Sequence, residues 1–475
     1  MKQILCILFI TLFFSCSNSG KKQRLAPKEI ENQSFIEQKI LIGTTVLDTI
    51  IPREGVKYKE VRFTNPLSLP IKLDFTRTDI PEKEFDLKDY CSSIQYITLK
   101  FPYPDKGGFL GESKISILYE QGSTSMRGYG ADIRLLGDKI IAGDRYQGYY
   151  LYDKDGNYIR SLISPDNWHD YNARSNKLTI EQKSLNKDFG ISTLGDNYLL
   201  SVKKDGKGTM YFGNAVKDEV YLQRPYYNGT GYLASNTSYL KYNYHPEYSR
   251  QILAQTLSLE DEILCKFSNN NPVLVKQENT GYYPQNKIIY DYDGVLTFRQ
   301  QYNDTIFRLK SDHELEAAYI LNFGDKRQGV QDGYVGRHDG KYAPDTWLET
   351  QNFVWFLFTE GRDTPAAREM GTVKFFYYFY DKKEKQLYKQ PTSDFPETVL
   401  MKNTLENGLP MRGYFAISNG KTLYEGFTKN QLQLLIKHPV FNRFTLEEQE
   451  RMKTHCEALG ERDLLLILLT LNANN

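Results

Sequence analysis

The sequence has almost no net charge and few of the residues that build metal sites. Its 475 residues include 60 Lys and Arg against 59 Asp and Glu, which leaves a formal net charge of +1. A chain with so little surplus charge has no overall field that attracts nucleic acid, so nucleic acid is not an expected partner. The six histidines are scattered and never paired at ligand spacing. We therefore expect no metal and no other cofactor.

Cysteine is scarce, and its positions exclude a disulfide framework. Of five cysteines, Cys6 and Cys16 lie at the N-terminus, and three remain. Cys91, Cys265 and Cys456 are widely separated and form no Cys-x-x-Cys pair, the spacing typical of zinc sites and redox motifs. Three cysteines allow one bridge at most. We expect three buried thiols instead.

The sequence also lacks an apolar run long enough to span a membrane. The N-terminal run covers residues 4–14, whereas a spanning helix needs about 20 residues. It follows Lys2 and precedes the small residue Ser15, which predicts a secretory signal peptide over residues 1–15. Placing Cys16 directly after this segment resembles the lipobox of bacterial lipoproteins, whose thiol is diacylated and becomes the new N-terminus. An ordinary signal peptide with a chance cysteine is the alternative.

A lipid on this cysteine would anchor the protein in the cell envelope. Two or three acyl chains, at about 0.8 kcal/mol per buried methylene, hold a protein durably on a membrane. Residues 16–38 are polar and predict a flexible tether. Lys21 and Lys22 precede the first acid, Glu29, whereas surface lipoproteins of Bacteroidetes carry acids soon after the lipidated cysteine. The resemblance implies an outer-membrane anchor, with a periplasm-facing position favoured over a surface-exposed one.

Aromatic residues and glycine are abundant. The 36 Tyr and 26 Phe favour strands, and the 34 Gly supply turns. Between residues 131 and 163 the sequence alternates short strands with tight-turn dipeptides. The expected strands are 131–136, 139–142, 148–152 and 158–163. The turn Leu136-Gly137-Asp138 recurs as Leu194-Gly195-Asp196, which predicts a repeat of four-stranded units.

Repeated four-stranded units that stack radially form a β-propeller. Later segments give looser versions of the same pattern, and the best count is six blades. We therefore predict an all-β fold, a six-bladed β-propeller over residues 84–475. The ring would close when the first strand, within 85–99, joins the last, 464–471, in one blade. Residues 39–83 add a short β segment whose role is open.

A short helical insertion is expected before the last strand. Two capping boxes of the form Ser/Thr-x-x-Glu/Gln begin at Thr428 and Thr445. They predict helices near 429–438 and 446–459. Cys456 lies at the spacing of an apolar helical face, which accounts for this residue by packing alone.

Three segments, together with the lipobox cysteine, carry a family resemblance. They are Phe85–Leu99, Leu151–Ile159 and Arg299–Phe307. In this order and spacing they resemble the six-bladed β-propeller lipoproteins of Bacteroidetes, most of which have no known function. The resemblance covers about residues 84–475. It implies a fold and a location in the envelope, and it supplies no catalytic motif.

Motifs of common enzymes are missing. The sequence contains no His-Glu-x-x-His and no Gly-x-Ser-x-Gly, so zincin and α/β-hydrolase chemistry have no support. Asp153-x-Asp155-Gly156 lacks the carboxylates that a calcium loop needs at its first and twelfth positions, and it predicts a hairpin turn. Carboxylates from different blades would leave no local signature, so a propeller glycoside hydrolase or polysaccharide lyase stays an alternative. No catalytic residue is predicted.

The leading hypothesis is a binding or interaction module. Its ligand would be a glycan, a peptide or another envelope protein, and a structural subunit of an envelope complex is a further alternative. Ligands of propellers bind at one mouth of the central channel, where a fixed charge and flat rings suit a carboxylate, a sugar face or a peptide backbone. The candidate residues are Arg145, Tyr146, Trp168, Arg299 and Tyr302. Arg299 could instead brace neighbouring blades.

Overall fold

A computed structural model gives the fold of the chain. It describes residues 45–47, 61–63, 70–102, 132–144, 148–163, 188–204, 207–217, 219–226, 231–242, 252–268, 288–329, 332, 339–361, 371–391, 400–412, 416–418 and 421–473. All of these belong to one compact unit, Ile40–Asn475.

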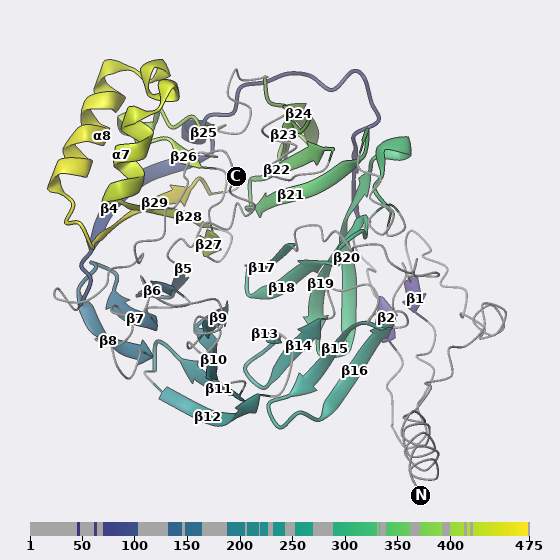
Figure 1. Cartoon of the computed structure of the whole chain (residues 1–475). Coiled ribbons are helices and arrows are strands. Elements are labelled where there is room, and N and C mark those ends of the chain that lie inside the picture. Colours follow the sequence, from purple (N-terminus) through teal and green to yellow (C-terminus); the bar gives the residue numbers. More distant parts are fainter. Residues whose placement is uncertain are drawn as a thin grey trace, which may run out of the picture. The chain divides into compact units, whose positions relative to one another are not determined.

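Six antiparallel four-stranded arrays form the blades of a propeller, which Figure 1 shows arranged around a ring. Blade 1 contains β5 (Asp132–Leu136), β6 (Lys139–Asp144), β7 (Gly148–Asp153) and β8 (Tyr158–Ile163). Blade 2 contains β9 (Asp188–Leu194), β10 (Asn197–Lys204), β11 (Lys207–Asn214) and β12 (Glu219–Tyr226). Blade 3 contains β13 (Gly231–Leu233), β14 (Ser238–Tyr242), β15 (Ile252–Ser258) and β16 (Ile263–Ser268).

The remaining blades complete the ring and confirm the predicted six-bladed β-propeller. Blade 4 contains β17 (Ile288–Tyr292), β18 (Val295–Arg299), β19 (Thr305–Ser311) and β20 (Glu314–Asn322). Blade 5 contains β21 (Tyr342–Glu349), β22 (Phe353–Glu360), β23 (Lys374–Asp381) and β24 (Gln386–Lys389). Blade 6 contains β27 (Ala416–Ser418), β28 (Thr422–Thr428), β29 (Leu464–Leu471) and β4 (Cys91–Leu99). Shorter elements are η1 (Leu87–Asp89), η2 (Gly324–Lys326), β25 (Leu400–Met401), η4 (Leu405–Asn407) and β26 (Met411–Arg412).

Blade 6 joins strands from the two ends of the propeller. Its outermost strand, β4, precedes all other blades in the sequence, whereas its other three strands follow them. β29 pairs with β4 along its length, from Leu464 opposite Leu99 to Leu471 opposite Cys91. Most side chains of β29 are buried, so the two strands share apolar contacts as well as hydrogen bonds. The prediction that one blade unites both ends is confirmed.

Residues 71–99, named here the N-terminal strap, pass the outer edges of blades 4, 5 and 6 in turn. β3 (Ile71–Asp74) pairs in parallel with β20 of blade 4. Glu82 forms a parallel bridge with Lys389 of β24 in blade 5, and Asp86 forms another beside β25. β4 then completes blade 6. Figure 1 shows the strap as the dark blue-purple ribbon that runs from β20 toward β25.

Two further strands extend the sheet of blade 4. β1 (Thr45–Leu47) pairs with β2 (Val61–Phe63), and β2 pairs in parallel with β20 where Arg62 lies opposite Glu314. The N-terminal β segment thus adds strands to the outer edge of one blade, which the sequence had left open.

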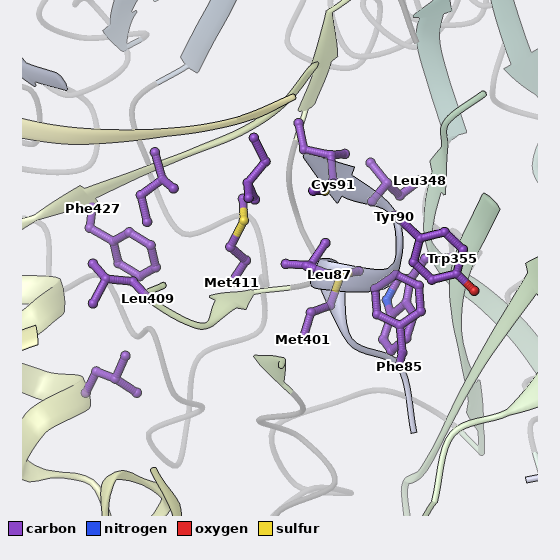
Figure 2. Close-up of a cluster of buried hydrophobic side chains, with 14 of the residues drawn as sticks. Phe85, Leu87, Tyr90, Cys91, Leu348, Trp355, Met401, Leu409, Met411 and Phe427 are labelled. Atoms are coloured by element: carbon purple, nitrogen blue, oxygen red, sulfur yellow. The ribbon is translucent and has the colours of Figure 1, made fainter. Parts of the chain in front are cut away.

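Phe85 anchors the strap in the apolar core between blades 5 and 6. Figure 2 shows its ring beside Tyr90 and Trp355. The ring centroids lie 5.1 Å from Tyr90 and 5.0 Å from Trp355, and all three side chains are buried. The Tyr90 hydroxyl donates a hydrogen bond of 2.9 Å to Oδ2 of Asp381. Because burial of one such ring contributes about 1.5–3 kcal/mol, this contact stabilises the strap strongly.

The two faces of the ring differ in their connections. Antiparallel strands place the turns between the first and second strand, and between the third and fourth, on one face, named here the turn face. These turns are tight, such as 137–138 and 293–294. The opposite face, named the loop face, takes the links between second and third strands and between blades. The long connections of the six blades, including 164–187, 269–287 and 429–463, depart from the loop face.

The turn face explains the repeated Leu-Gly-Asp signal. Gly137 and Gly195 occupy corresponding turns of blades 1 and 2, with φ values of 56° and 55°. Glycine adopts this left-handed region without the steric cost that a Cβ brings. Asp153, in another turn, accepts backbone hydrogen bonds from Asp155 and Asn157 through Oδ1. Its segment is therefore the predicted hairpin turn.

The helical insertion departs from the loop face of blade 6. It comprises α7 (Lys429–Lys437), η5 (Pro439–Arg443) and α8 (Leu446–Ala458). Both predicted capping boxes form, with Thr428 and Thr445 as the N-caps. Met452 and Cys456 on α8 are buried against the core of blade 6. The prediction of a short helical insertion before the last strand is confirmed.

The three remaining cysteines are buried and free, as expected. Burial, with a contribution from Asp86, raises the pKa of the Cys91 thiol to about 12. This thiol therefore stays protonated and behaves as a core residue.

Truncation before Arg462 should destabilise the entire ring. It removes β29, so β4 and β28 lose the strand that they share, and the buried side chains of both become exposed. We expect the cooperative thermal transition measured by circular dichroism to disappear. A control truncation after Asn472, beyond β29, should melt like the full chain. If the protein truncated before Arg462 melted like the full chain, the ring would not depend on this closure.

Candidate functional site

Three of the five candidate ligand residues lie outside the described residues, as does Cys16. Arg145 and Tyr146 follow β6, and Trp168 follows β8. The described strands that precede them, β6 and β8, both end at the loop face. A ligand-binding role for these residues stays a prediction.

Arg299 and Tyr302 lie in or beside the hairpin that joins β18 to β19 on the loop face. Each is only 1% exposed, contrary to the expectation that both face solvent. Nε of Arg299 donates a hydrogen bond of 2.7 Å to the backbone oxygen of Asn303, so the guanidinium braces the hairpin from inside. Tyr302 has a φ of 60°, which bulky residues rarely adopt. Contact of these two residues with a ligand stays a prediction. Their contacts within the hairpin are observed directly.

The same hairpin carries a half-buried acid, Asp304, whose side chain is 26% exposed. Asp304 forms an ion pair with Arg327. Burial raises the pKa of the Asp304 carboxyl, and Arg327 and Arg299 partly offset that effect. Further polar side chains buried here are Gln300, Gln301, Asn303, Thr305 and Gln328. The loop-face end of blade 4 is therefore a polar, internally bonded layer.

A second buried polar group lies between blades 4 and 5, and it is named here the Glu349 cluster. Its members are Tyr290 and Tyr292 of β17, Arg308 of β19, Tyr319 of β20, Trp347 and Glu349 of β21, and Lys382, which follows β23. Tyr292 and Glu349 end their strands, and Lys382 begins a hairpin turn. The cluster therefore extends toward the turn face.

Glu349 is fully enclosed and accepts four hydrogen bonds from side chains. Oε1 accepts from Nη2 of Arg308, from the Tyr319 hydroxyl at 2.5 Å and from Nζ of Lys382 at 2.8 Å. Oε2 accepts from the Tyr290 hydroxyl at 2.6 Å. A carboxylate in a dry environment is tolerated only with such partners.

The charges of the cluster are fixed near neutral pH. Burial alone would raise the pKa of Glu349, but the attraction of Lys382 and Arg308 lowers it below its usual value. Burial and the neighbouring carboxylate raise the pKa of Tyr290 and Tyr319 well above the usual value for a phenol. The carboxylate is therefore ionised, and both phenols keep the protons that they donate.

Tyr292 contacts both cations of the cluster. Cζ of Arg308 lies 4.4 Å and Nζ of Lys382 lies 4.6 Å from the centroid of its ring, within cation–π range. Lys382 also donates to the Tyr292 hydroxyl at 3.2 Å and to the backbone oxygen of Thr350 at 2.5 Å. The two cationic side chains are 19% and 17% exposed, so solvent reaches the edge of the cluster.

This arrangement can hold two blades together and can attract an anion. It offers no free base, because both oxygens of Glu349 are occupied and its pKa is low. Within the described ranges, no group of three or more His, Cys, Asp or Glu could hold a metal ion. The same ranges contain no helix that is long and apolar enough to cross a membrane.

The Glu349 cluster has no motif in the sequence that predicts it. Its members come from two blades and are spread over residues 290–382, so no motif spacing connects them. The one local signal is the alternation of Tyr290 and Tyr292, which places both rings on the same side of a strand. That signal is weak in a chain with 36 tyrosines.

Glu349→Gln should lower the free energy of unfolding at pH 7 by about 3–5 kcal/mol, because it leaves Arg308 and Lys382 without their counter-charge. Urea unfolding measures the change. Because the folded pKa of Glu349 is lowered, its stabilisation is present above the ordinary Glu pKa and is lost as the pH falls. The difference between the two proteins should therefore shrink below about pH 4.3.

Glu84→Gln is the matched control, because Glu84 pairs with Lys402 at 3.0 Å but is 61% exposed. It should change stability by less than about 1 kcal/mol. Equal effects of the two substitutions would contradict a special role for the buried carboxylate.

Comparisons with known proteins give one family and several structural similarities. The curated proteins contain no match. Among solved structures, a candidate exported protein from Bacteroides fragilis has a TM-score of 0.48 and 12% identity, over 85% of this chain and 99% of that one. BamB from Moraxella catarrhalis has a TM-score of 0.31 and 9% identity, over 62% of this chain and 92% of BamB. The β-propeller domain of the Trilobed protease from Pyrococcus furiosus has a TM-score of 0.27 and 11% identity, over 62% of this chain and 89% of that domain.

The family comparison covers most of the propeller. A family profile described as a domain of unknown function matches residues 53–438, from the segment before β2 as far as the end of α7. This range exceeds half of the 475 residues. The chain therefore belongs to the family described as a domain of unknown function (DUF4933).

Proposed function

We propose that this protein is a lipid-tethered binding module of the cell envelope, which presents its loop face to a glycan, peptide or protein ligand. The observation that carries the proposal is the difference between the two faces. Within the six blades the turn face has only tight turns of at most four residues, whereas every long connection within or between the blades departs from the loop face. Recognition in rigid scaffolds is concentrated in such loops, because a loop can vary while the strands beneath it keep their packing.

Two of the candidate ligand residues follow strands that end at the loop face. Arg145 and Trp168 belong to connections that begin at the loop-face ends of β6 and β8. Arg299 and Tyr302, in contrast, support the hairpin beneath the surface of blade 4. We therefore assign ligand contact to the connections of blades 1 and 2, and a bracing role to the blade 4 hairpin.

The tether is the second part of the proposal. The signal peptide and the lipobox-like Ser15-Cys16 would leave a lipid on the mature N-terminus, followed by the polar stretch 16–38. A tether of this composition behaves as a flexible coil, so the propeller could reach ligands near the membrane without entering it. Outer-membrane attachment and a periplasm-facing position are part of the same proposal.

Replacing Arg145 and Trp168 together with alanine should weaken ligand binding. The measurement is biolayer interferometry of the purified protein against a panel of polysaccharides, peptidoglycan fragments and peptides. At least one panel member should bind the unmodified protein, and the double variant should bind it at least about tenfold more weakly, since aromatic and arginine anchors dominate such contacts.

Lys154→Ala is the control, because Lys154 is an exposed residue of a turn-face hairpin. It should bind as the unmodified protein does. Equal loss in this control would refute recognition by the loop face. Release of new reducing ends from a polysaccharide of the panel would favour the hydrolase or lyase alternative over a binding module.

Cys16→Ala should release the protein from the membrane fraction, because no acyl chain could then be attached. Fractionation with detergent-phase partitioning measures this. Cys6→Ala is the matched control, since it changes a cysteine within the signal peptide and should leave the protein membrane-bound. A Cys16→Ala protein that stays in the detergent phase would refute the lipid anchor.

A further inference from the structure

Arg308 uses little of its hydrogen-bonding capacity. A guanidinium has five N–H donors, and in the described part of the chain Arg308 donates one hydrogen bond, from Nη2 to Glu349. Its Nε is enclosed without an acceptor. Nη1 has no hydrogen-bond partner among the described residues and is not among the enclosed atoms, so solvent reaches it.

Lys382 differs from Arg308 in this respect. Its Nζ has three donors, and it contacts three acceptors, which are Glu349, Thr350 and the Tyr292 hydroxyl. Lys382 therefore has no donor left for a ligand. Its role in the cluster is to fix the position of Glu349 and Tyr292, between which the guanidinium is held.

The charges around the guanidinium leave a positive surplus. Glu316 lies opposite Arg308 in the pairing of β19 with β20, and it forms an ion pair of 3.7 Å with Lys310. Glu316 and Lys310 thus balance each other, whereas in the cluster two cations, Arg308 and Lys382, contact one carboxylate, Glu349. The surplus lies in a partly enclosed site, where water screens a charge less than at an open surface.

We propose that the Glu349 cluster is an anion site in which the outer end of the Arg308 guanidinium binds the carboxylate of a small acidic ligand. Nη1 and the second hydrogen of Nη2 form the outer end of the guanidinium. These two N–H groups can donate two parallel hydrogen bonds to the two oxygens of a planar carboxylate. Tyr292 keeps the guanidinium in place through its ring. Glu349 holds the other side of the same group.

This site is separate from the loop-face proposal. Tyr292, Glu349 and Lys382 lie at the strand ends that meet the turn face, whereas the candidate residues of blades 1 and 2 belong to the loop face. A failure of either proposal leaves the other intact, because the two are tested with different variants.

The test uses the full chain and sodium glucuronate as the carboxylate probe, with acetate, sulfate and neutral glucose as comparison probes. Isothermal titration should show binding of glucuronate and acetate and none of glucose. Arg308→Lys keeps the charge but removes the fork, so the affinity for glucuronate should fall about tenfold, as the loss of one charge-assisted hydrogen bond predicts.

Arg327→Lys is the matched control. Arg327 is a partly exposed arginine that pairs with the half-buried Asp304, but it lies in a connection of the loop face. It should leave the affinity for glucuronate unchanged. Loss of affinity in this variant, with none in Arg308→Lys, would overturn the assignment.

A second measurement does not depend on the folding of a variant. Phenylglyoxal modifies accessible guanidinium groups, and peptide mass spectrometry reports the extent at each arginine. Glucuronate should protect Arg308 in the unmodified protein and leave Arg327 reactive, whereas glucose should protect neither. Binding of sulfate without glucuronate, absence of any carboxylate binding, or modification of Arg308 unaffected by glucuronate would each refute the carboxylate site.

Discussion

The pairing of β29 with β4 is the constraint on which the ring depends. A radial array of sheets has an open first and last blade unless one blade takes strands from both ends of the chain. Here the closing ladder joins residues that are separated by nearly the whole propeller, so it forms against a large loop-closure entropy. The buried leucines of β29 offset that cost. The N-terminal strap extends the same pairing to blades 5 and 4, with Phe85 as its apolar anchor.

Two of the described interfaces between blades differ in their chemistry. Between blades 5 and 6 the contact is apolar and aromatic, with Phe85, Tyr90 and Trp355 packed together. Between blades 4 and 5 the apolar contact surrounds a charged group in which Glu349 binds Arg308 and Lys382. Buried charge is rarely the most stable filling of such a space. A charged interface that keeps one guanidinium end open is therefore better explained by recognition of an anion than by stability alone.

The fold could be predicted from the sequence because its signals are local. Tight-turn glycines such as Gly137 and Gly195, alternating strands, and the capping boxes of α7 and α8 each depend on residues within a few positions of one another. The burial of the candidate site residues could not be predicted in the same way. Arg299 and Tyr302 were assigned to a solvent-facing mouth, yet both are enclosed in the hairpin after β18. Residue type and position in a loop do not show which charged or aromatic side chains are buried.

The sequence by itself determined the number of blades, the strands that close the ring and the helical insertion, because periodicity, turn chemistry and helix caps encode them directly. The tertiary structure alone decided which side chains meet between blades. Tyr290, Arg308, Tyr319, Glu349 and Lys382 become neighbours only when blade 4 packs on blade 5. The same packing decided that Glu349 stays ionised, since its pKa results from the balance between burial and two cations of distant sequence position.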